Sequence, residues 1–195
     1  MTFLKVIRFL AGCSIIGGFF RALMTPLALV LGAESVPELV SGVLGTLFMG
    51  MGMFGLYMLH VKGMGKLGFA AFILHSIGSF ILMALVFSNL VFAVFDPHVL
   101  ESDAAPLPFI IAGTLVMPLM VGSMILFAVT VLKTKVFSKL PALLLLLSPV
   151  VNFLPIVSDF SPLIWGLAFL LFGIEVWKKT ANKALTKLDL DNVSA

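Results

Sequence analysis

Arg21 is the residue in this sequence best suited to binding chemistry, because it is the one basic side chain inside an apolar segment. A guanidinium presents five N–H donors in a rigid fork that matches a carboxylate or a phosphate. Arg21 lies twelve residues after Phe9, where the segment begins, which is roughly 18 Å along a helix. The hydrocarbon core of a bilayer is about 30 Å thick. In a membrane-spanning helix Arg21 would therefore lie near the midplane, facing a bundle interior or a wet cavity.

Four further polar residues reach comparable depths in other apolar segments, and no acidic residue does. Counting inward from the basic end of each segment places His75 roughly 12 Å deep and Asn152 roughly 18 Å deep. Ser148 lies one helical turn before Asn152, and Ser123 falls at a similar level. We therefore predict an intramembrane ligand-binding layer, with no catalytic residue, formed by Arg21, His75, Ser123, Ser148 and Asn152.

Arg21 has two interpretations, and the sequence leaves both open. In the structural one, backbone carbonyls, Asn152 and hydroxyl groups hold the guanidinium and lock the bundle. In the functional one, an unpaired cation near the midplane awaits an anion such as a substrate carboxylate, a phosphate or a lipid headgroup. His75 can in principle carry protons, although an intramembrane histidine more often forms a hydrogen bond with a neighbouring helix.

Catalytic and metal-binding motifs are missing from the sequence. It contains no Gly-x-Ser-x-Gly, no His-Glu-x-x-His, no glycine-rich phosphate loop and no paired intramembrane aspartates. The single cysteine excludes a zinc site with several cysteine ligands. The stretch 96–103 holds one histidine and three carboxylates, but their spacing matches no defined metal site. We expect a protein without a cofactor or metal, and the balance favours one that is not an enzyme.

The composition indicates that much of the protein surface faces lipid. The helices that cross the lipid would then position Arg21 and the other polar residues. The 195-residue chain is 61% hydrophobic and 11% charged, whereas a soluble domain averages roughly 45–50% apolar and 25% charged residues. Its mean hydropathy is +1.22. At about 20 residues per span, the chain has room for six helices and short loops. The sequence therefore predicts an all-α membrane protein with a single transmembrane domain, a compact bundle of six helices.

The six apolar segments can be read directly from the sequence. They cover about 9–31, 39–60, 67–95, 107–132, 140–157 and 162–177. The fifth contains Pro149 and Pro155, so we expect it to be kinked or partly re-entrant. Residues 178–195 form a basic tail that we expect to begin as a continuation of the last helix.

Charged residues in the breaks between segments indicate the orientation. The two ends and the even-numbered breaks carry eleven of the twelve basic residues, whereas the odd-numbered breaks carry six acidic residues and no basic one. Loops rich in lysine and arginine face the cytoplasm. The sequence therefore predicts six spans with both termini, including the tail, in the cytoplasm.

A short stretch of sequence also carries a resemblance. Gly55-Leu56-Tyr57 leads through Gly63 into Gly65-Lys66-Leu67-Gly68-Phe69. This stretch resembles small, functionally uncharacterised six-span bacterial integral membrane proteins, mainly over the first three segments. The resemblance implies a multi-pass protein of the bacterial cytoplasmic membrane and no particular activity.

Two classes of function follow. The first is a membrane protein that binds or transports a small anionic or amphipathic solute, or a lipid, around Arg21. The alternative is a non-catalytic membrane module, such as an accessory subunit of a transport complex, an immunity or resistance protein, or a sensor. The expected partners are the lipid bilayer, the anionic or lipid ligand, and a second copy or a partner subunit. Nucleic acid is not expected, because the basic residues are scattered between apolar segments.

Overall fold

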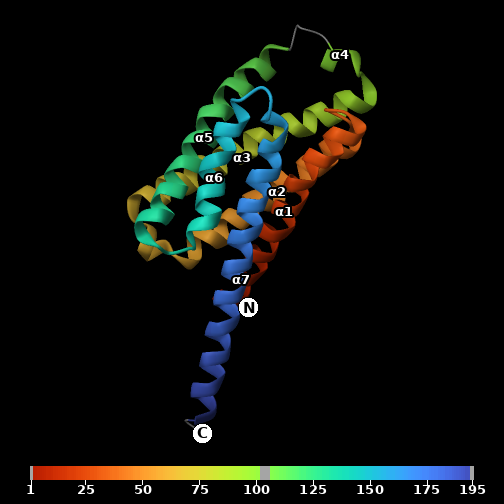
Figure 1. Cartoon of the computed structure of the whole chain (residues 1–195). Helices are drawn as coiled ribbons and strands as arrows, with labels where there is room; N and C mark the ends of the chain where they lie inside the picture. The colour runs from red at the N-terminus through yellow and green to blue at the C-terminus, as the bar shows by residue number, and fades with distance from the viewer. Residues whose placement is uncertain (1, 102–105, 194–195) are drawn as a thin grey trace.

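The computed structural model describes residues 2–101 and 106–193, and all of the regular secondary structure in these ranges is helical. Figure 1 shows the helices gathered side by side, with the C-terminal part of the last helix projecting beyond the others. The elements are α1 (Phe3–Leu31), α2 (Val36–Leu59), α3 (Val61–Phe95), α4 (His98–Glu101), α5 (Leu107–Thr134), α6 (Lys139–Asn152), the 3-10 helix η1 (Ser158–Phe160) and α7 (Ser161–Val193).

Within the described ranges, five helical segments are long and apolar enough to cross a membrane. They are α1, α2, α3, α5 and Ser158–Asn182, which joins η1 to most of α7. These lengths and compositions indicate a multi-pass membrane protein. Five of the six predicted apolar segments correspond to such helices, and the remaining one, 140–157, does not.

The predicted segment 140–157 is helical only as far as Asn152 in the structure. Helix α6 has 14 residues, which span about 21 Å of a hydrocarbon core about 30 Å thick. The helix ends here because Leu154 precedes Pro155, and the residue before a proline disfavours the α conformation. The prediction of an interrupted segment is thus refined to a short helix followed by turns and η1.

The break between the predicted segments 39–60 and 67–95 is also shorter than expected. Helix α3 begins at Val61 and contains one non-helical residue, Gly65, with φ 58° and ψ −158°. This left-handed conformation is accessible to glycine at little steric cost. Gly65 therefore bends the chain between α2 and the long apolar part of α3 without a separate loop.

Helix α1 lies at the centre of the contacts, packed against α2 on one side and α7 on another. A Cβ atom placed on Gly18 would lie 2.5 Å from the carbonyl oxygen of Gly166 in α7. The hydroxyl of Ser14 donates a hydrogen bond to the carbonyl oxygen of Phe169 at 2.8 Å. Small residues thus let the backbones of α1 and α7 come into contact. Such contacts are common between membrane helices, because lipid is as apolar as the side chains and hydrophobic burial does not favour helix association there.

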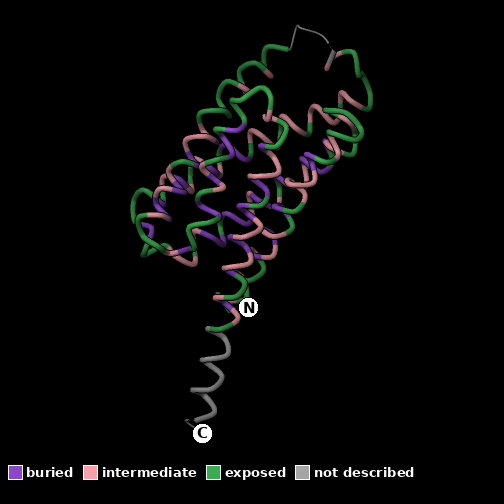
Figure 2. Tube along the Cα trace, in the orientation of Figure 1, coloured by how far each residue is buried: buried purple, intermediate pink, exposed green. Residues whose placement is uncertain are grey.

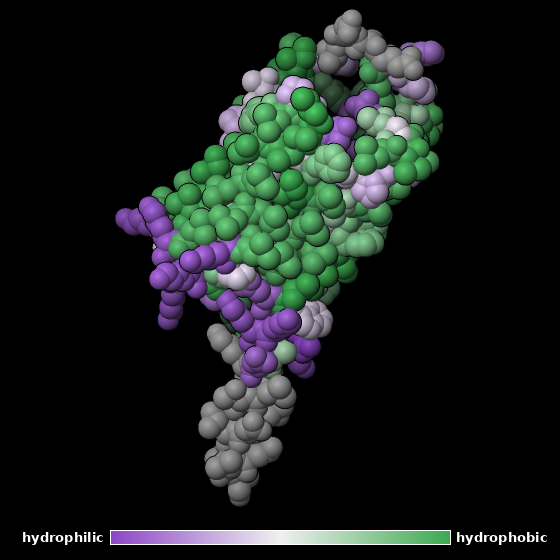
Figure 3. Space-filling model, viewed as in Figure 1, coloured by the Kyte–Doolittle hydropathy of each residue, from purple (hydrophilic) through white to green (hydrophobic). Residues whose placement is uncertain are grey.

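The other helices complete the bundle around this pair. Helix α3 packs mainly against α5 and α2, and α6 packs against α7 and α5. The buried residues line the inward-facing sides of the helices (Figure 2). Hydrophobic residues cover the flank of the bundle that Figure 3 shows. Many large apolar side chains are exposed, among them Phe80 at 64%. An apolar flank of this extent is expected of a surface in contact with lipid.

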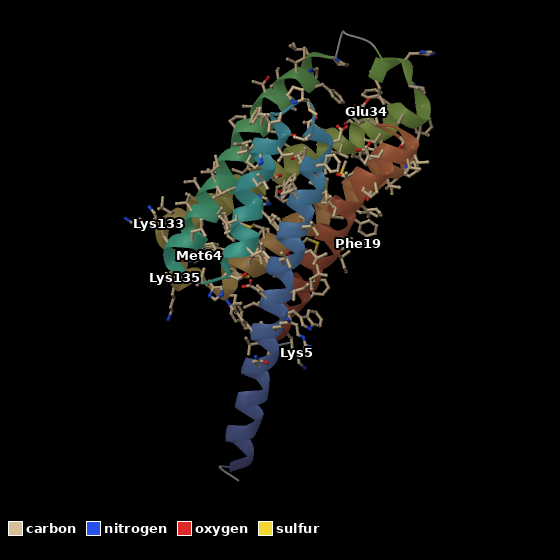
Figure 4. All side chains as sticks on the ribbon, viewed as in Figure 1. Lys5, Phe19, Glu34, Met64, Lys133 and Lys135 are labelled. Atoms are coloured by element: carbon tan, nitrogen blue, oxygen red, sulfur yellow. The ribbon has the colours of Figure 1, made fainter. Side chains whose placement is uncertain are left out.

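Charged residues gather at the ends of the bundle. Both termini lie at one end (Figure 1). Figure 4 places Lys5, Lys133 and Lys135 at this same end and Glu34 at the opposite end. The basic and acidic breaks of the sequence therefore correspond to opposite ends of the folded chain.

The contact between α1 and α7 leads to a first prediction. Gly166→Ala should lower the free energy of unfolding by about 1–3 kcal/mol, because the new Cβ would overlap the carbonyl oxygen of Gly18 and the backbone of Ala22. Gly122→Ala on α5 is the matched control, since its Cβ would have no atom within 4 Å. Thermal unfolding in detergent, followed by circular dichroism, measures the difference. Equal melting temperatures for the two variants would contradict this packing.

Candidate functional site

Arg21 lines a cavity of about 240 Å³ between helices α1, α3, α5, α6 and α7. One wall is polar and includes Arg21, Ser148, Asn152 and Ser161. The other wall is apolar and comes mainly from α5. Its α5 side chains are Val116, Met117, Met120, Val121 and Met124.

The guanidinium of Arg21 contacts an aromatic ring and a methionine sulfur, and it has no ion pair within the described residues. Its Cζ atom lies 4.4 Å from the centre of the Trp165 ring, and Nη1 donates to the sulfur of Met24 at 3.3 Å. The Nε atom is buried without a hydrogen-bond partner in the described ranges. Glu38 attracts Arg21 from beyond ion-pair distance. A cation–π contact stabilises such a cation by about 2 kcal/mol when it is desolvated, but it leaves N–H donors unused.

The backbone around Arg21 is fixed by its neighbours. A Cβ on Gly45 of α2 would lie 2.9 Å from the backbone nitrogen of Arg21, so the two helices touch at this level. One turn further along α1, the hydroxyl of Thr25 donates to the carbonyl oxygen of Asp159 at 2.6 Å. This bond draws η1 against α1. Arg21 therefore has a defined position, set by α2 on one side and the α6–α7 connection on another.

Two buried serines join α6 to the start of α7 at the polar wall. The hydroxyl of Ser161 donates to the carbonyl oxygen of Ser148 at 3.1 Å, and the two hydroxyl oxygens are 3.2 Å apart. Asn152 lies one turn beyond Ser148, is exposed at the cavity, and its side-chain amide makes no hydrogen bond to the described residues. The wall thus offers hydroxyl and amide groups beside a guanidinium, which suits the recognition of a carboxylate or a phosphate.

His75 and Ser123 form a separate pair that does not line the cavity. Ser123 donates its hydroxyl hydrogen to the carbonyl oxygen of Met120 at 2.8 Å. Its oxygen therefore accepts from Nδ1 of His75, 3.2 Å away, which assigns the proton of a neutral His75 to Nδ1. The imidazole stacks on Phe169 with ring centres 5.2 Å apart. Its Nε2 has no hydrogen-bond partner in the described part of the chain.

The predicted polar layer is therefore divided into two groups. Arg21, Ser148 and Asn152 share the cavity, whereas His75 and Ser123 lie behind its wall. Trp165 stands between the groups, because its ring contacts Arg21 on one side and lies edge-on to the ring of His75, 6.4 Å away. This arrangement has cationic, hydroxyl and amide groups facing one space, and among the described residues that line it no histidine, aspartate or glutamate faces Ser148 or Ser161.

Sequence reasoning missed two members of the site. Trp165 and Ser161 were not among the expected residues, although a desolvated arginine commonly takes an aromatic face as its partner. Trp165 was detectable as a tryptophan inside an apolar segment, away from basic neighbours. The sequence also indicates that the α5 methionines share one face of a helix, because Met117, Met120 and Met124 recur at spacings of three and four residues.

The pair of His75 and Ser123 gives a second prediction. Ser123→Ala should lower the free energy of unfolding by about 1–3 kcal/mol, because it leaves the buried Nδ1–H of His75 without an acceptor. The double variant His75→Phe/Ser123→Ala removes both polar groups and should cost less than the sum of the single changes. Thermal unfolding of the four proteins measures this coupling. Strictly additive changes would show that the two side chains do not interact.

A scan of the chain against protein-family models found no match, and comparisons with curated proteins and with solved structures found none. The resemblance of residues 55–69 to small bacterial membrane proteins therefore stays a prediction. These comparisons supply no ligand for the cavity, so a proposal about it has to be argued from its lining residues.

Proposed function

We propose that this chain is a six-span membrane protein that binds an amphipathic molecule with a small anionic head in the Arg21 cavity. The observation that carries the proposal is the state of Arg21. Its guanidinium lines a cavity, has no ion pair in the described ranges and retains a buried Nε without a partner. An anion in the cavity would accept from these donors and offset the cost of a cation at this depth.

The head of the ligand fits the polar wall. A carboxylate or a phosphate oxygen can accept from the guanidinium fork of Arg21, from a serine hydroxyl and from the amide of Asn152. Within a membrane, surroundings of low dielectric constant would strengthen each of these interactions relative to bulk water. The cationic charge selects anions over neutral heads, and the fork geometry favours groups with two oxygens.

The apolar part of the ligand fits the α5 wall. Met117, Met120 and Met124 are unbranched and flexible, so they adapt to apolar groups of differing shape. Met117 is 46% exposed, and Asn152 is exposed at the other side of the cavity. In a membrane these exposed positions would face lipid. A cavity of about 240 Å³ accommodates the head and the first part of a tail, and the rest of the tail extends into the bilayer.

The six-span topology is supported by the position of the short helix α6. The connection from α6 to η1 is apolar and exposed, with Phe153 at 65% and Ile156 at 96%. The bond of Thr25 to Asp159 holds η1 six residues before the end of α1, roughly 9 Å below it. The connection would thus lie at the outer edge of the hydrocarbon core, near the acidic end of the chain, and complete the crossing that α6 begins. The basic end, with both termini, faces the cytoplasm in this proposal.

Topology gives a third prediction, tested by cysteine labelling in a Cys13→Ser background. Glu34→Cys should react with an impermeant maleimide added outside intact cells. Lys135→Cys and Lys178→Cys should react only after permeabilisation, because six spans place both at the cytoplasmic end. Ile156→Cys should react slowly in both conditions, since lipid shields it. Labelling of Lys135→Cys and Lys178→Cys from opposite sides would exclude six spans, and external labelling of both would reverse the orientation.

Ligand binding gives a fourth prediction, with dodecyl phosphate as the probe and dodecanol as the neutral control. Added to protein in a non-ionic detergent, dodecyl phosphate should raise the melting temperature and change the emission of Trp165 in a Trp177→Phe background. Arg21→Gln should weaken binding about 10- to 100-fold, from the loss of one charged hydrogen-bonding group. Arg21→Lys should fall between the two, because it keeps the charge without the fork.

The matched control is Lys133→Gln, which removes a cation outside the cavity and should leave binding unchanged. Two results would contradict the proposal. If Arg21→Gln and Arg21→Lys both lose folded protein, Arg21 is a structural lock. If dodecanol binds as well as dodecyl phosphate, the cavity does not select an anion.

A further inference from the structure

A groove of about 350 Å³ runs along α1 at the basic end of the chain, away from the Arg21 cavity. Its mouth carries two cations, and its floor and walls are apolar. The residues that matter are Lys5, Arg8, Gly12 and Ile16 of α1, Phe48 of α2 and Trp177 of α7. We propose that this groove binds one anionic phospholipid, with the headgroup at Lys5 and Arg8 and an acyl chain between Gly12 and Ile16.

The groove has the length and direction of half a bilayer. Lys5, Arg8, Gly12 and Ile16 recur at spacings of three and four, so they lie along one face of α1. From Lys5 to Ile16 the helix rises about 16 Å, against a hydrocarbon core about 30 Å thick. Charge at one end and apolar surface over the remainder match the headgroup and the chain of a lipid in one leaflet.

Gly12 creates the hollow, and Trp177 forms its wall. A Cβ placed on Gly12 would lie 3.4 Å from the ring of Trp177, an ordinary contact distance. A glycine here leaves the groove open beside the indole, next to exposed apolar neighbours of which Ile16 is 45% exposed, and the groove as a whole has a volume of about 350 Å³. A methylene chain in this gap would contact the indole ring, a residue type that is common where a bilayer meets water.

The two cations have no compensating charge in the described part of the chain. The guanidinium of Arg8 stacks on Trp177, with Cζ 4.4 Å from the ring centre. One face of the guanidinium plane is therefore covered by the ring, and the N–H groups along its edge remain available to donate hydrogen bonds. Neither side chain forms an ion pair with a described residue. The carboxylate of Glu175 on α7 accepts instead from the backbone nitrogen and the hydroxyl of Ser138. An anionic headgroup is attracted to such a basic pair at the membrane surface.

Charge also argues against a second copy of the chain in the groove. In a symmetric contact, Lys5 and Arg8 would approach their own copies, and like charges in close contact are repulsive.

The proposal requires a membrane-spanning chain but is independent of what Arg21 binds. Figure 3 shows hydrophilic residues gathered at the end from which α7 projects, where the headgroups of one leaflet would lie.

The experiment uses quenching of Trp177 by brominated lipids in a Trp165→Phe background. The full chain is reconstituted in phosphatidylcholine vesicles that contain a minor fraction of either brominated phosphatidylglycerol or brominated phosphatidylcholine. We expect the brominated phosphatidylglycerol to quench Trp177 more strongly at equal mole fraction. The double variant Lys5→Gln/Arg8→Gln should reduce this preference by at least about fivefold. Gly12→Leu, which fills the gap without changing charge, should also reduce quenching, and Gly12→Ala should reduce it less.

The matched control is Lys133→Gln/Lys135→Gln, which removes two cations from the same end but outside the groove. Its lipid preference should equal that of the unmodified chain, and so should that of Arg21→Gln, which separates this site from the Arg21 cavity. Equal quenching by the two lipids would overturn the proposal. So would an equal loss in the control, because the effect would then be general surface charge. If millimolar inorganic phosphate displaced the brominated phosphatidylglycerol, the ligand would be a free anion rather than a lipid. If the quenching disappeared as the protein density in the vesicles rose, the groove would be occupied by a second copy of the chain. Either result would overturn the proposal.

Discussion

The close approach of α1 and α7 is the contact on which the rest of the structure depends. The two helices run antiparallel and touch where Gly18 meets Gly166. On one side of this contact Arg21 stacks on Trp165, and on the other side Arg8 stacks on Trp177, each at 4.4 Å. One helix pair therefore builds both arginine–tryptophan contacts. A wider separation of the backbones would remove both at once.

The two arginines sit in different surroundings, although each lies over a tryptophan ring. Arg8 is exposed and lines a groove together with Lys5, which lies at the basic end. Arg21 lies within the bundle, on the polar wall of the cavity. The same guanidinium–indole contact thus occurs at the basic end of α1 and at a cavity wall further along it.

The short helix α6 has a similar double consequence. Its last turn, with Ser148, Pro149 and Asn152, lines the cavity. The bonds between Ser148 and Ser161 and between Thr25 and Asp159 hold the turns that follow it against α1 and α7. The helix that ends before Pro155 therefore contributes both to the cavity wall and to the connection that packs beside Arg21.

The sequence by itself determined the class of protein, the apolar segments, the separation of basic from acidic breaks and the isolation of Arg21 within an apolar segment. These features depend on position along the chain, and a constant rise per residue converts position into depth. Only the tertiary structure decided that Arg21 takes Trp165 as its partner, that His75 and Ser123 stand apart from the cavity, and that α6 ends at Asn152. Those outcomes depend on which helix faces which, and at what rotation. Small residues at backbone contacts such as Gly18 and Gly166 set these relations, and hydropathy does not encode them.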